Sequence, residues 1–182
     1  MNPAQRRMPG DPAPETSLAR MLRVDHAGEY GAARIYAGQL AVLRRSETAP
    51  LLREMQAQEQ QHLERFADLI VRRRVRPTVM LPLWHLAGFA LGAATAALGE
   101  RAAMACTVAV EEAIDAHYGD QIAALDDCNT ELRDTLTRFR DDELHHRSIA
   151  LQHGAEQAPG YRMLSAAIKI GCKLAIRISE RI

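Results

Sequence analysis

Glutamate and histidine stand three residues apart in two stretches of the sequence, Glu59-Gln-Gln-His62 and Glu143-Leu-His-His146. Both stretches lie in runs where apolar residues recur every three or four positions, which is the pattern of one buried helix face. One such pair alone is common on solvated helices and is weak evidence. Two copies, each in the middle of an apolar stripe, indicate ligands that point into a helical core.

Two further predicted helices carry acids on their apolar stripes. One stripe consists of Leu22, Asp25, Glu29, Ala33, Tyr36, Leu40 and Leu43. The other consists of Ala105, Val108, Glu111, Asp115, Tyr118, Ile122 and Leu125. An internal repeat relates them, because Glu29 and Glu111 are both followed by tyrosine after seven residues and by glutamine after ten. The repeat selects Glu111, and not the adjacent Glu112, as the buried acid.

Four carboxylates would therefore meet in one core, those of Glu29, Glu59, Glu111 and Glu143. Buried free charges are strongly unfavourable, so a cationic group is needed between them. Two divalent metal ions balance four negative charges, and neutral His62 and His146 add nitrogen ligands. One glutamate from each of two helices and Glu-x-x-His from each of two others is the dimetal pattern of ferritin-like bundles. Oxygen and nitrogen ligands suit iron or manganese, and such a pair suits the reduction of dioxygen.

The composition supports an all-α chain of about one domain. The 182 residues are 47% hydrophobic but only 4% aromatic, which favours helices over a β-sandwich. Lysine and arginine (23) equal aspartate and glutamate (23), so no basic excess points to nucleic acid. Three widely spaced cysteines without a Cys-x-x-Cys pair predict neither a disulfide framework nor a thiolate site, and favour a reducing compartment.

The breakers divide the chain into a leader and six helices. Residues 1–16 hold four of the eight prolines and predict a disordered leader with no targeting pattern. The predicted helices span about 17–45, 50–74, 80–98, 100–127, 130–153 and 160–180. One long crossover among four long helices predicts a ferritin-like four-helix bundle over 17–182, with repeat halves 17–74 and 100–153 and two additional helices.

Those two additional helices have the composition of membrane-facing segments. Residues 77–99 contain no charged residue and follow an arginine-rich stretch, but proline, histidine and glycine make them too weakly apolar for a predicted span. The last helix sets Lys169, Lys173, Arg177 and Arg181 beside Ile170, Leu174, Ile178 and Ile182. We expect residues 72–99 and 160–182 to contact a membrane surface. Packing of the last helix on the bundle or on a second subunit is the alternative.

Six stretches of the chain are similar to a known family: Arg23-Val-Asp-His-Ala-Gly-Glu-Tyr-Gly-Ala32, Ile35-Tyr-Ala-Gly-Gln39, Arg74-Val-Arg-Pro-Thr78, Pro82-Leu-Trp84, Ala103-Met-Ala-Cys-Thr-Val-Ala-Val-Glu-Glu112 and Ser179-Glu-Arg181. Over about residues 20–182 the sequence resembles the demethoxyubiquinone hydroxylases, the di-iron monooxygenases of ubiquinone biosynthesis. The resemblance implies hydroxylation of the ring of a polyprenyl demethoxyubiquinol by dioxygen. It also implies a peripheral protein on the cytoplasmic face of a bacterial inner membrane, or on the mitochondrial inner membrane of a eukaryote.

The same resemblance assigns the ligands of two iron ions. One iron takes Glu29, Glu59 and His62, and the other takes Glu111, Glu143 and His146, with Glu59 and Glu143 bridging. The sequence has no nucleotide-binding or flavin motif, so electrons come from an external donor, NADH or a quinol. A second copy of the chain and a lipid-presenting protein are candidate partners. The ligand set alone also allows a ferroxidase or rubrerythrin-like protein, or a metal-dependent membrane scaffold without turnover.

Several other residues near the predicted ligands have candidate roles. His117 and Tyr118 are candidates for a proton or electron relay, whereas core filling is the expected role of Tyr36. Asp25, Asp115 and Asp142 lie beside ligands or one turn away, where a carboxylate can orient a ligand histidine. A surface ion pair is an equally good expectation for Asp142.

Overall fold

The structure is a computed structural model that describes residues 14–182. This part of the chain contains six α-helices, one short 3-10 helix and no strand, which confirms the all-α prediction. The helices are α1 Pro14–Leu43, α2 Ala49–Arg72, α3 Leu81–Ala97, α4 Glu100–Ala124, α5 Thr130–Gln152 and α6 Tyr161–Ser179, with η2 Ala155–Gln157 between the last two.

The helix ends follow the breakers in the sequence to within three residues. α1 begins at Pro14, three residues before the predicted start, since proline is well suited to a first turn. Residues 14–16 of the predicted leader are therefore helical, and the rest of that leader, 1–13, lies outside the described residues. α3 and α4 are separated by Gly99, whose φ of 113° is accessible to glycine but not to other residues at low cost.

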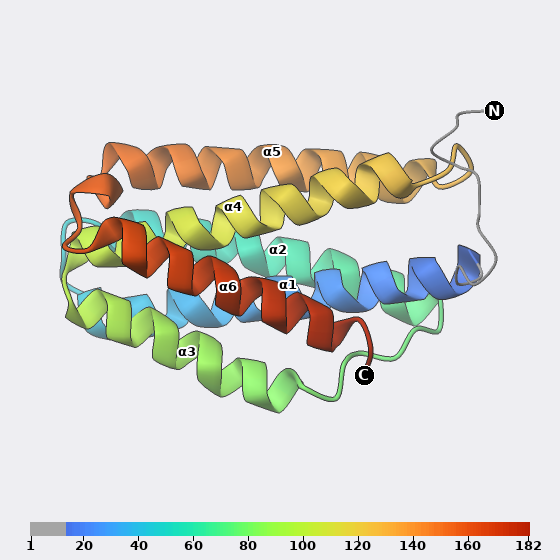
Figure 1. Cartoon of the computed structure of the whole chain (residues 1–182), viewed down its shortest axis with the longest axis horizontal. Coiled ribbons are helices and arrows are strands. Elements are labelled where there is room, and N and C mark those ends of the chain that lie inside the picture. The colour runs from blue at the N-terminus through green and yellow to red at the C-terminus, as the bar shows by residue number, and fades with distance from the viewer. Residues whose placement is uncertain (1–13) are drawn as a thin grey trace.

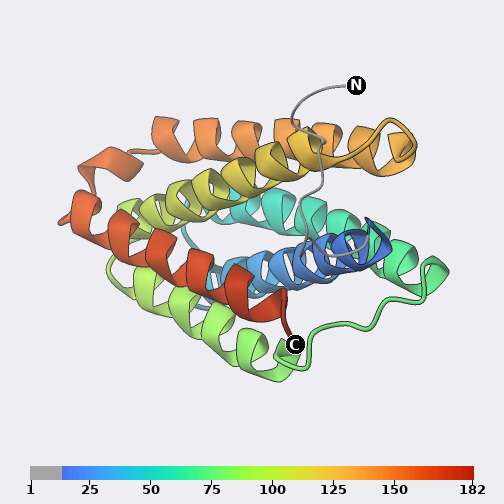
Figure 2. The same ribbon diagram turned by 45° about the vertical axis from the view of Figure 1, so that its right-hand side comes forward.

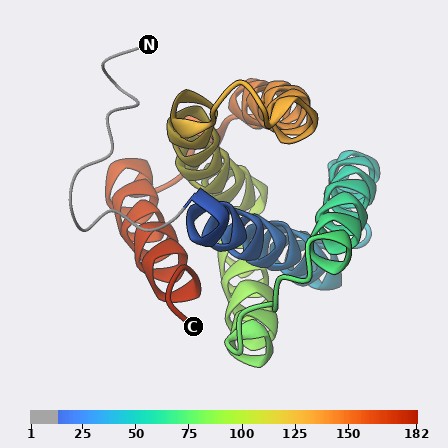
Figure 3. The ribbon, with the colours of Figure 1, turned by 90° about the vertical axis from the view of Figure 1, so that its right-hand side faces the viewer.

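Two antiparallel helix pairs form the centre of the molecule. α1 packs on α2 and α4 packs on α5, so each half of the sequence repeat folds into one pair (Figure 1). The segment 73–80 leads from the end of α2 to α3, and together with α3 it makes the crossover between the two pairs (Figure 2). Seen along the helix axes, α3 lies on α1, and α6 lies on α4 and α1 (Figure 3).

Two apolar clusters fill the opposite ends of the four central helices. Phe66, Tyr118 and Phe139 belong to one cluster, near the ends of the helices where α1 begins and α2 ends. Tyr36, Met55 and Met104 belong to the other, where α1 ends and α2 begins. The predicted ligands lie between these clusters along the helices, so apolar packing encloses a polar middle layer.

α3 and α6 present apolar side chains to the outside. The exposed large apolar residues of these helices are Leu83, Leu86, Phe89, Met163, Ile170 and Leu174. Lys169, the first residue of the predicted basic row of α6, donates from its Nζ to Glu112 Oε2 at 2.9 Å and so contacts α4. Among the described helices, none combines the length and the apolarity needed to cross a membrane.

Candidate metal centre

All six predicted ligands lie in one buried layer. Each central helix contributes one glutamate, from Glu29 of α1, Glu59 of α2, Glu111 of α4 and Glu143 of α5. Since residues three apart share a helix face, α2 and α5 also direct His62 and His146 into the same layer. The exposed fraction of these six residues is 2% or less.

The six side chains form two overlapping groups. Glu29, Glu59, His62 and Glu143 bring one ligand atom each to within 4.8 Å of one another. Glu59, Glu111, Glu143 and His146 form a second group within the same limit. Glu59 and Glu143 belong to both groups, so each has the position required of a carboxylate that bridges two ions.

The donor atoms of this layer fit metal ions. Eight of them have no hydrogen-bond partner among the described residues: Oε2 of Glu29 and Glu111, both carboxylate oxygens of Glu59 and Glu143, and Nδ1 of His62 and His146. Both Nδ1 atoms face carboxylate oxygens, His62 at 3.2 Å from Glu143 and His146 at 3.2 Å from Glu59. Buried donors without partners are costly, and a cation among them removes that cost.

The electrostatics of the metal-free cluster show the same need for cations. Burial, together with the neighbouring carboxylates, raises the pKa of Glu59 and Glu111 well above the usual range. Burial opposes the ionised form of Glu143 too, but its close contacts with His146, His62 and Glu111 outweigh burial and lower its pKa to about 2. Contacts with Glu143 and Glu29 favour the protonated form of His62, so its pKa rises to about 10 despite burial. Without metal, a protonated His62 therefore faces an ionised Glu143.

The second ring nitrogen of each predicted ligand histidine contacts a side chain of the opposite repeat half. That side chain directly precedes the glutamate of the Glu-x-x-His pair there. Asp142 Oδ2 lies 3.0 Å from His62 Nε2, which is the contact that the predicted orienting role requires. Gln58 Oε1 lies 2.9 Å from His146 Nε2. Sequence reasoning missed Gln58, although its place directly before Glu59 matches that of Asp142 before Glu143. Such contacts fix the ring so that Nδ1 points at the metal position.

The two repeat tyrosines reach across to the opposite half. Tyr36 of α1 donates its hydroxyl hydrogen to Glu111 Oε1 at 2.7 Å, and Tyr118 of α4 donates to Glu29 Oε1. Tyr36 therefore does more than fill the core, since its hydroxyl contacts a predicted ligand. Tyr118 contacts the cluster as the predicted relay requires, whereas His117 contacts Asp25.

Two of the aspartates predicted to orient ligand histidines do not contact them. Asp25 accepts a hydrogen bond from Gln121 Nε2 at 2.7 Å. Asp115 pairs with Arg140 at 2.5 Å, at a partly exposed position. Both predictions rested on helical spacing alone, which places a residue on a face but does not say which neighbouring helix it meets.

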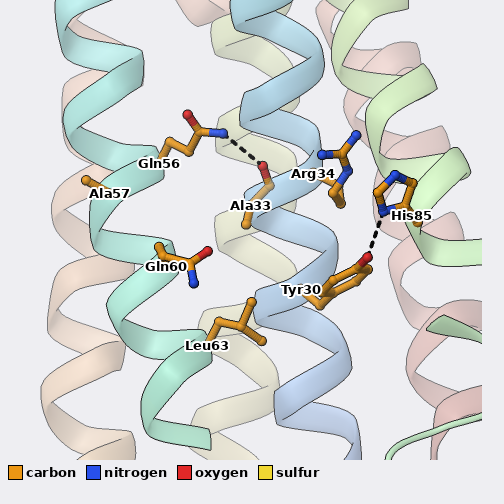
Figure 4. A pocket seen from close by; sticks show the side chains of 8 residues that line it. All are labelled: Tyr30, Ala33, Arg34, Gln56, Ala57, Gln60, Leu63 and His85. Atoms are coloured by element: carbon orange, nitrogen blue, oxygen red, sulfur yellow. Dashed lines mark hydrogen bonds between the residues drawn. The ribbon is translucent and has the colours of Figure 1, made fainter. Parts of the chain in front are cut away.

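The buried layer of the six predicted ligands is called the metal layer. A groove of about 450 Å³ lies outside it, between α1, α2 and α3. Its lining consists of Tyr30, Ala33, Arg34, Gln56, Ala57, Gln60, Leu63 and His85 (Figure 4). Tyr30 and His85 share a hydrogen bond of 2.7 Å there, and Gln56 donates to the carbonyl oxygen of Ala33. None of the six cluster residues lines this groove, so it is separate from the metal layer.

The sequence profile of the family described as "Ubiquinone biosynthesis protein COQ7" matches residues 16–179. The chain belongs to this family. It is 58% identical over 180 residues to a "3-demethoxyubiquinol 3-hydroxylase" of Rhodospirillum rubrum, covering 98% of this chain and 85% of the relative. It is 53% identical to the human "NADPH-dependent 3-demethoxyubiquinone 3-hydroxylase, mitochondrial", covering 91% and 78%. A yeast "5-demethoxyubiquinone hydroxylase, mitochondrial" is 42% identical, with the same coverage.

Membership of the COQ7 family agrees with the resemblance seen in the sequence. The relatives are named as hydroxylases of ubiquinone biosynthesis, and several eukaryotic ones as mitochondrial. Their names describe a redox enzyme, and the buried layer of carboxylates and imidazoles is the part of this chain suited to hold redox metal ions.

Proposed function

We propose that this chain hydroxylates the ring of a polyprenyl demethoxyubiquinol, with dioxygen as the oxidant and two iron ions in the buried layer. Glu29, Glu59 and His62 would hold one ion, and Glu111, Glu143 and His146 the other. The overlap of the two ligand groups at Glu59 and Glu143 is the observation that carries the proposal. When bound, a carboxylate-bridged iron pair supplies the two-electron chemistry that activates dioxygen.

The protein residues prepare the site for that chemistry. Asp142 and Gln58 orient the two histidines, and the hydroxyls of Tyr36 and Tyr118 hold carboxylate oxygens of Glu111 and Glu29. Phe139 stacks on the His62 ring with 3.8 Å between ring centres, so bulk water is kept from this side of the layer. Tyr118 and, behind it, His117 are the proposed relay for protons or electrons.

The electron donor in this proposal comes from outside the chain. The names of several relatives include NADPH dependence, which supports a nicotinamide nucleotide as the donor here. The quinol itself is the other candidate. Two electrons and two protons are needed for each dioxygen, because one oxygen atom enters the ring and the other leaves as water.

We also propose that the four central helices form a ferritin-like bundle and that the chain is a peripheral membrane protein. α3 and α6 would form its membrane-facing surface. Leu86 and Met163, with exposed fractions of 68% and 82%, support this orientation because exposed large apolar side chains favour a lipid environment. Lys173 and Arg177 of α6 are also exposed, which suits anionic headgroups. The isoprenoid tail of the substrate would remain in the lipid while its ring enters the protein. A ferroxidase or rubrerythrin-like activity is not favoured, since the relatives are named as hydroxylases.

The test is product formation by the iron-loaded protein in detergent, with a short-chain demethoxyubiquinol, NADPH and isotopically heavy dioxygen. Mass spectrometry should find one heavy oxygen atom in the ring. Glu143→Ala should abolish the product while circular dichroism still reports a folded helical protein. Glu112→Gln is the matched control, because Glu112 neighbours Glu111 but pairs with Lys169 outside the cluster. Iron oxidation without ring hydroxylation would refute the proposed function.

A further inference from the structure

The contacts around the metal layer follow an approximate two-fold relation between the α1–α2 and α4–α5 pairs. Tyr36 contacts Glu111 while Tyr118, its repeat equivalent, contacts Glu29. The glutamines ten residues after each glutamate also reach across, Gln39 to α4 and Gln121 to α1. The two tyrosines thus make equivalent contacts and the two glutamines reach equivalent helices, so a contact that departs from the relation needs a separate explanation.

The relation fails at the contacts of the two glutamines. Gln39 Nε2 donates to the carbonyl oxygen of Ala103 at 3.0 Å and lies 3.5 Å from the hydroxyl of Thr107, four residues before Glu111. Gln121 Nε2 instead donates at 2.7 Å to Asp25, four residues before Glu29. A carboxylate therefore occupies the position that a hydroxyl occupies in the other half.

A histidine accompanies this aspartate. His117 Nε2 lies 2.8 Å from Gln121 Nε2 and 3.4 Å from Asp25 Oδ1. Ile35 is the residue at the equivalent position of the first repeat half, six residues after Glu29 as His117 is six after Glu111. One side of the metal layer therefore has an acid and an imidazole where the other side has a hydroxyl and an aliphatic chain.

Stability does not account for the aspartate. The Asp25 side chain is fully buried, and its Oδ2 has no hydrogen-bond partner among the described residues. Thr107 accepts the equivalent glutamine without a buried charge, so the link between α1 and α4 does not require a carboxylate. A buried carboxylate with one unpartnered oxygen destabilises the fold relative to a neutral residue.

We propose that Asp25 positions His117 and stabilises its protonated form, so that protons for the hydroxylation proposed above enter on the Glu29 side of the metal layer. This inference rests on the proposed function for the use of the protons, but the link between Asp25 and His117 stands on the contacts alone. In the neutral state, His117 Nε2 accepts from the Gln121 amide. When Nε2 is protonated, it donates to Asp25 Oδ1, and the Gln121 amide must rotate away because its Nε2 is also a donor.

The exposure of His117 and the enclosure of Asp25 suit a proton route. The His117 side chain is 17% exposed, whereas Asp25 is enclosed and lies one helical turn, about 6 Å along the helix, from Glu29. The ionisable groups that act on His117 are Asp25 of α1, Asp120 of its own helix and Glu180 directly after α6. All three are acids, so each favours the imidazolium. The two protons that the reaction takes up would pass from solvent to His117, whose protonated ring the ionised Asp25 stabilises. From there they would pass through Tyr118, which follows His117 in the chain and donates its hydroxyl hydrogen to Glu29 Oε1.

The first experiment uses the metal-free protein and does not depend on activity. Nitrogen-15 histidine spectra recorded against pH report the titration of His117, whose signal is assigned as the one missing in His117→Gln. Asp25→Asn keeps an acceptor for Gln121 but removes the charge, so the His117 midpoint should fall. Thr107→Ala, at the equivalent position of the other half, should leave the midpoint unchanged. An unchanged midpoint in a folded Asp25→Asn protein would overturn the proposal.

The second experiment measures turnover of the iron-loaded protein. Asp25→Asn and His117→Gln should each lower kcat about 100-fold, the usual size of a general acid–base contribution. The double variant should lose no more than either single variant, because both act in one route. Thr107→Ala should stay within about twofold of the parent protein.

Each failure has a distinct reading. A parent protein with no hydroxylation refutes the proposed function, while the histidine titration still tests the link between Asp25 and His117. An active parent with Asp25→Asn turning over at a similar rate overturns the proton route. Losses that multiply in the double variant contradict a shared route. If Asp25→Asn does not fold, His117→Gln, which changes a partly exposed side chain, tests the route by the loss of kcat.

Discussion

Replacing Gly92 of α3 with alanine should separate α3 from α1. The two helices approach so closely at this point that an alanine Cβ would lie 2.8 Å from the carbonyl carbon of Ile35 and 3.0 Å from the backbone nitrogen of Gln39. The carbonyl oxygen of Ile35 would be closer still. Ordinary carbon contacts measure about 3.5–4.0 Å, so α3 must move outward by about 1 Å. The clash is with backbone, which cannot rotate away as a side chain can.

The cost follows from that displacement. Overpacking of this kind costs about 1–3 kcal/mol, and the better helix propensity of alanine offsets up to about 1 kcal/mol. A net loss of about 1 kcal/mol lowers the melting temperature of a chain of this length by about 2–4 °C. Thermal unfolding followed by circular dichroism measures the shift.

Gly171→Ala is the matched control. Gly171 also lies within a helix, but nothing lies within 4 Å of the added Cβ, so only the propensity changes. This variant should be more stable by about 0.5–1 kcal/mol. A Gly92→Ala protein as stable as the parent would show that the close approach of α1 and α3 does not exist in solution.

Three more outcomes are expected. Asp142→Asn should weaken metal binding about 10–100-fold, because it removes the carboxylate that contacts the His62 ring. The exposed Asp141→Asn is the control and should not weaken binding. Equal affinities of the two variants in a metal titration would contradict the orienting contact. Metal binding should release protons and strengthen as pH rises, because the pKa of His62 is raised to about 10 without metal and its proton must leave first; calorimetry in buffers of different ionisation enthalpy measures the release. Lys173→Gln should weaken binding to anionic vesicles by about 1 kcal/mol, and Lys169→Gln by less, because the Lys169 ammonium is already paired; equal losses in vesicle flotation would contradict that pairing.

The six predicted ligands were accessible from the sequence because helical periodicity is local. A glutamate on a mainly apolar helix stripe indicates a buried acid, whatever the neighbouring helix is. The repeat of tyrosine and glutamine after Glu29 and Glu111 added the register, and so selected Glu111 over Glu112. The helix ends were predictable for the same reason, since proline and glycine act on their own turn of the chain.

Contacts between helices could be predicted from the sequence only in part. Asp25, Asp115 and Asp142 all had spacing suited to orienting a histidine, yet only Asp142 contacts one of the ligands. Lys169 belongs to the basic row by its spacing, but only the packing of α6 on α4 shows that the Lys169 ammonium reaches Glu112.

The sequence by itself determined the helices, the acids on their buried faces and the candidate ligand set, because each depends on residues within a few turns of one another. Only the tertiary structure decided which repeat half each polar side chain contacts. Tyr36, Gln39 and Gln58 all contact the opposite repeat half, since the two helix pairs face each other across the metal layer. The unequal surroundings of Glu29 and Glu111 follow from the same packing, which brings Asp25 and His117 together from helices about ninety residues apart in the chain.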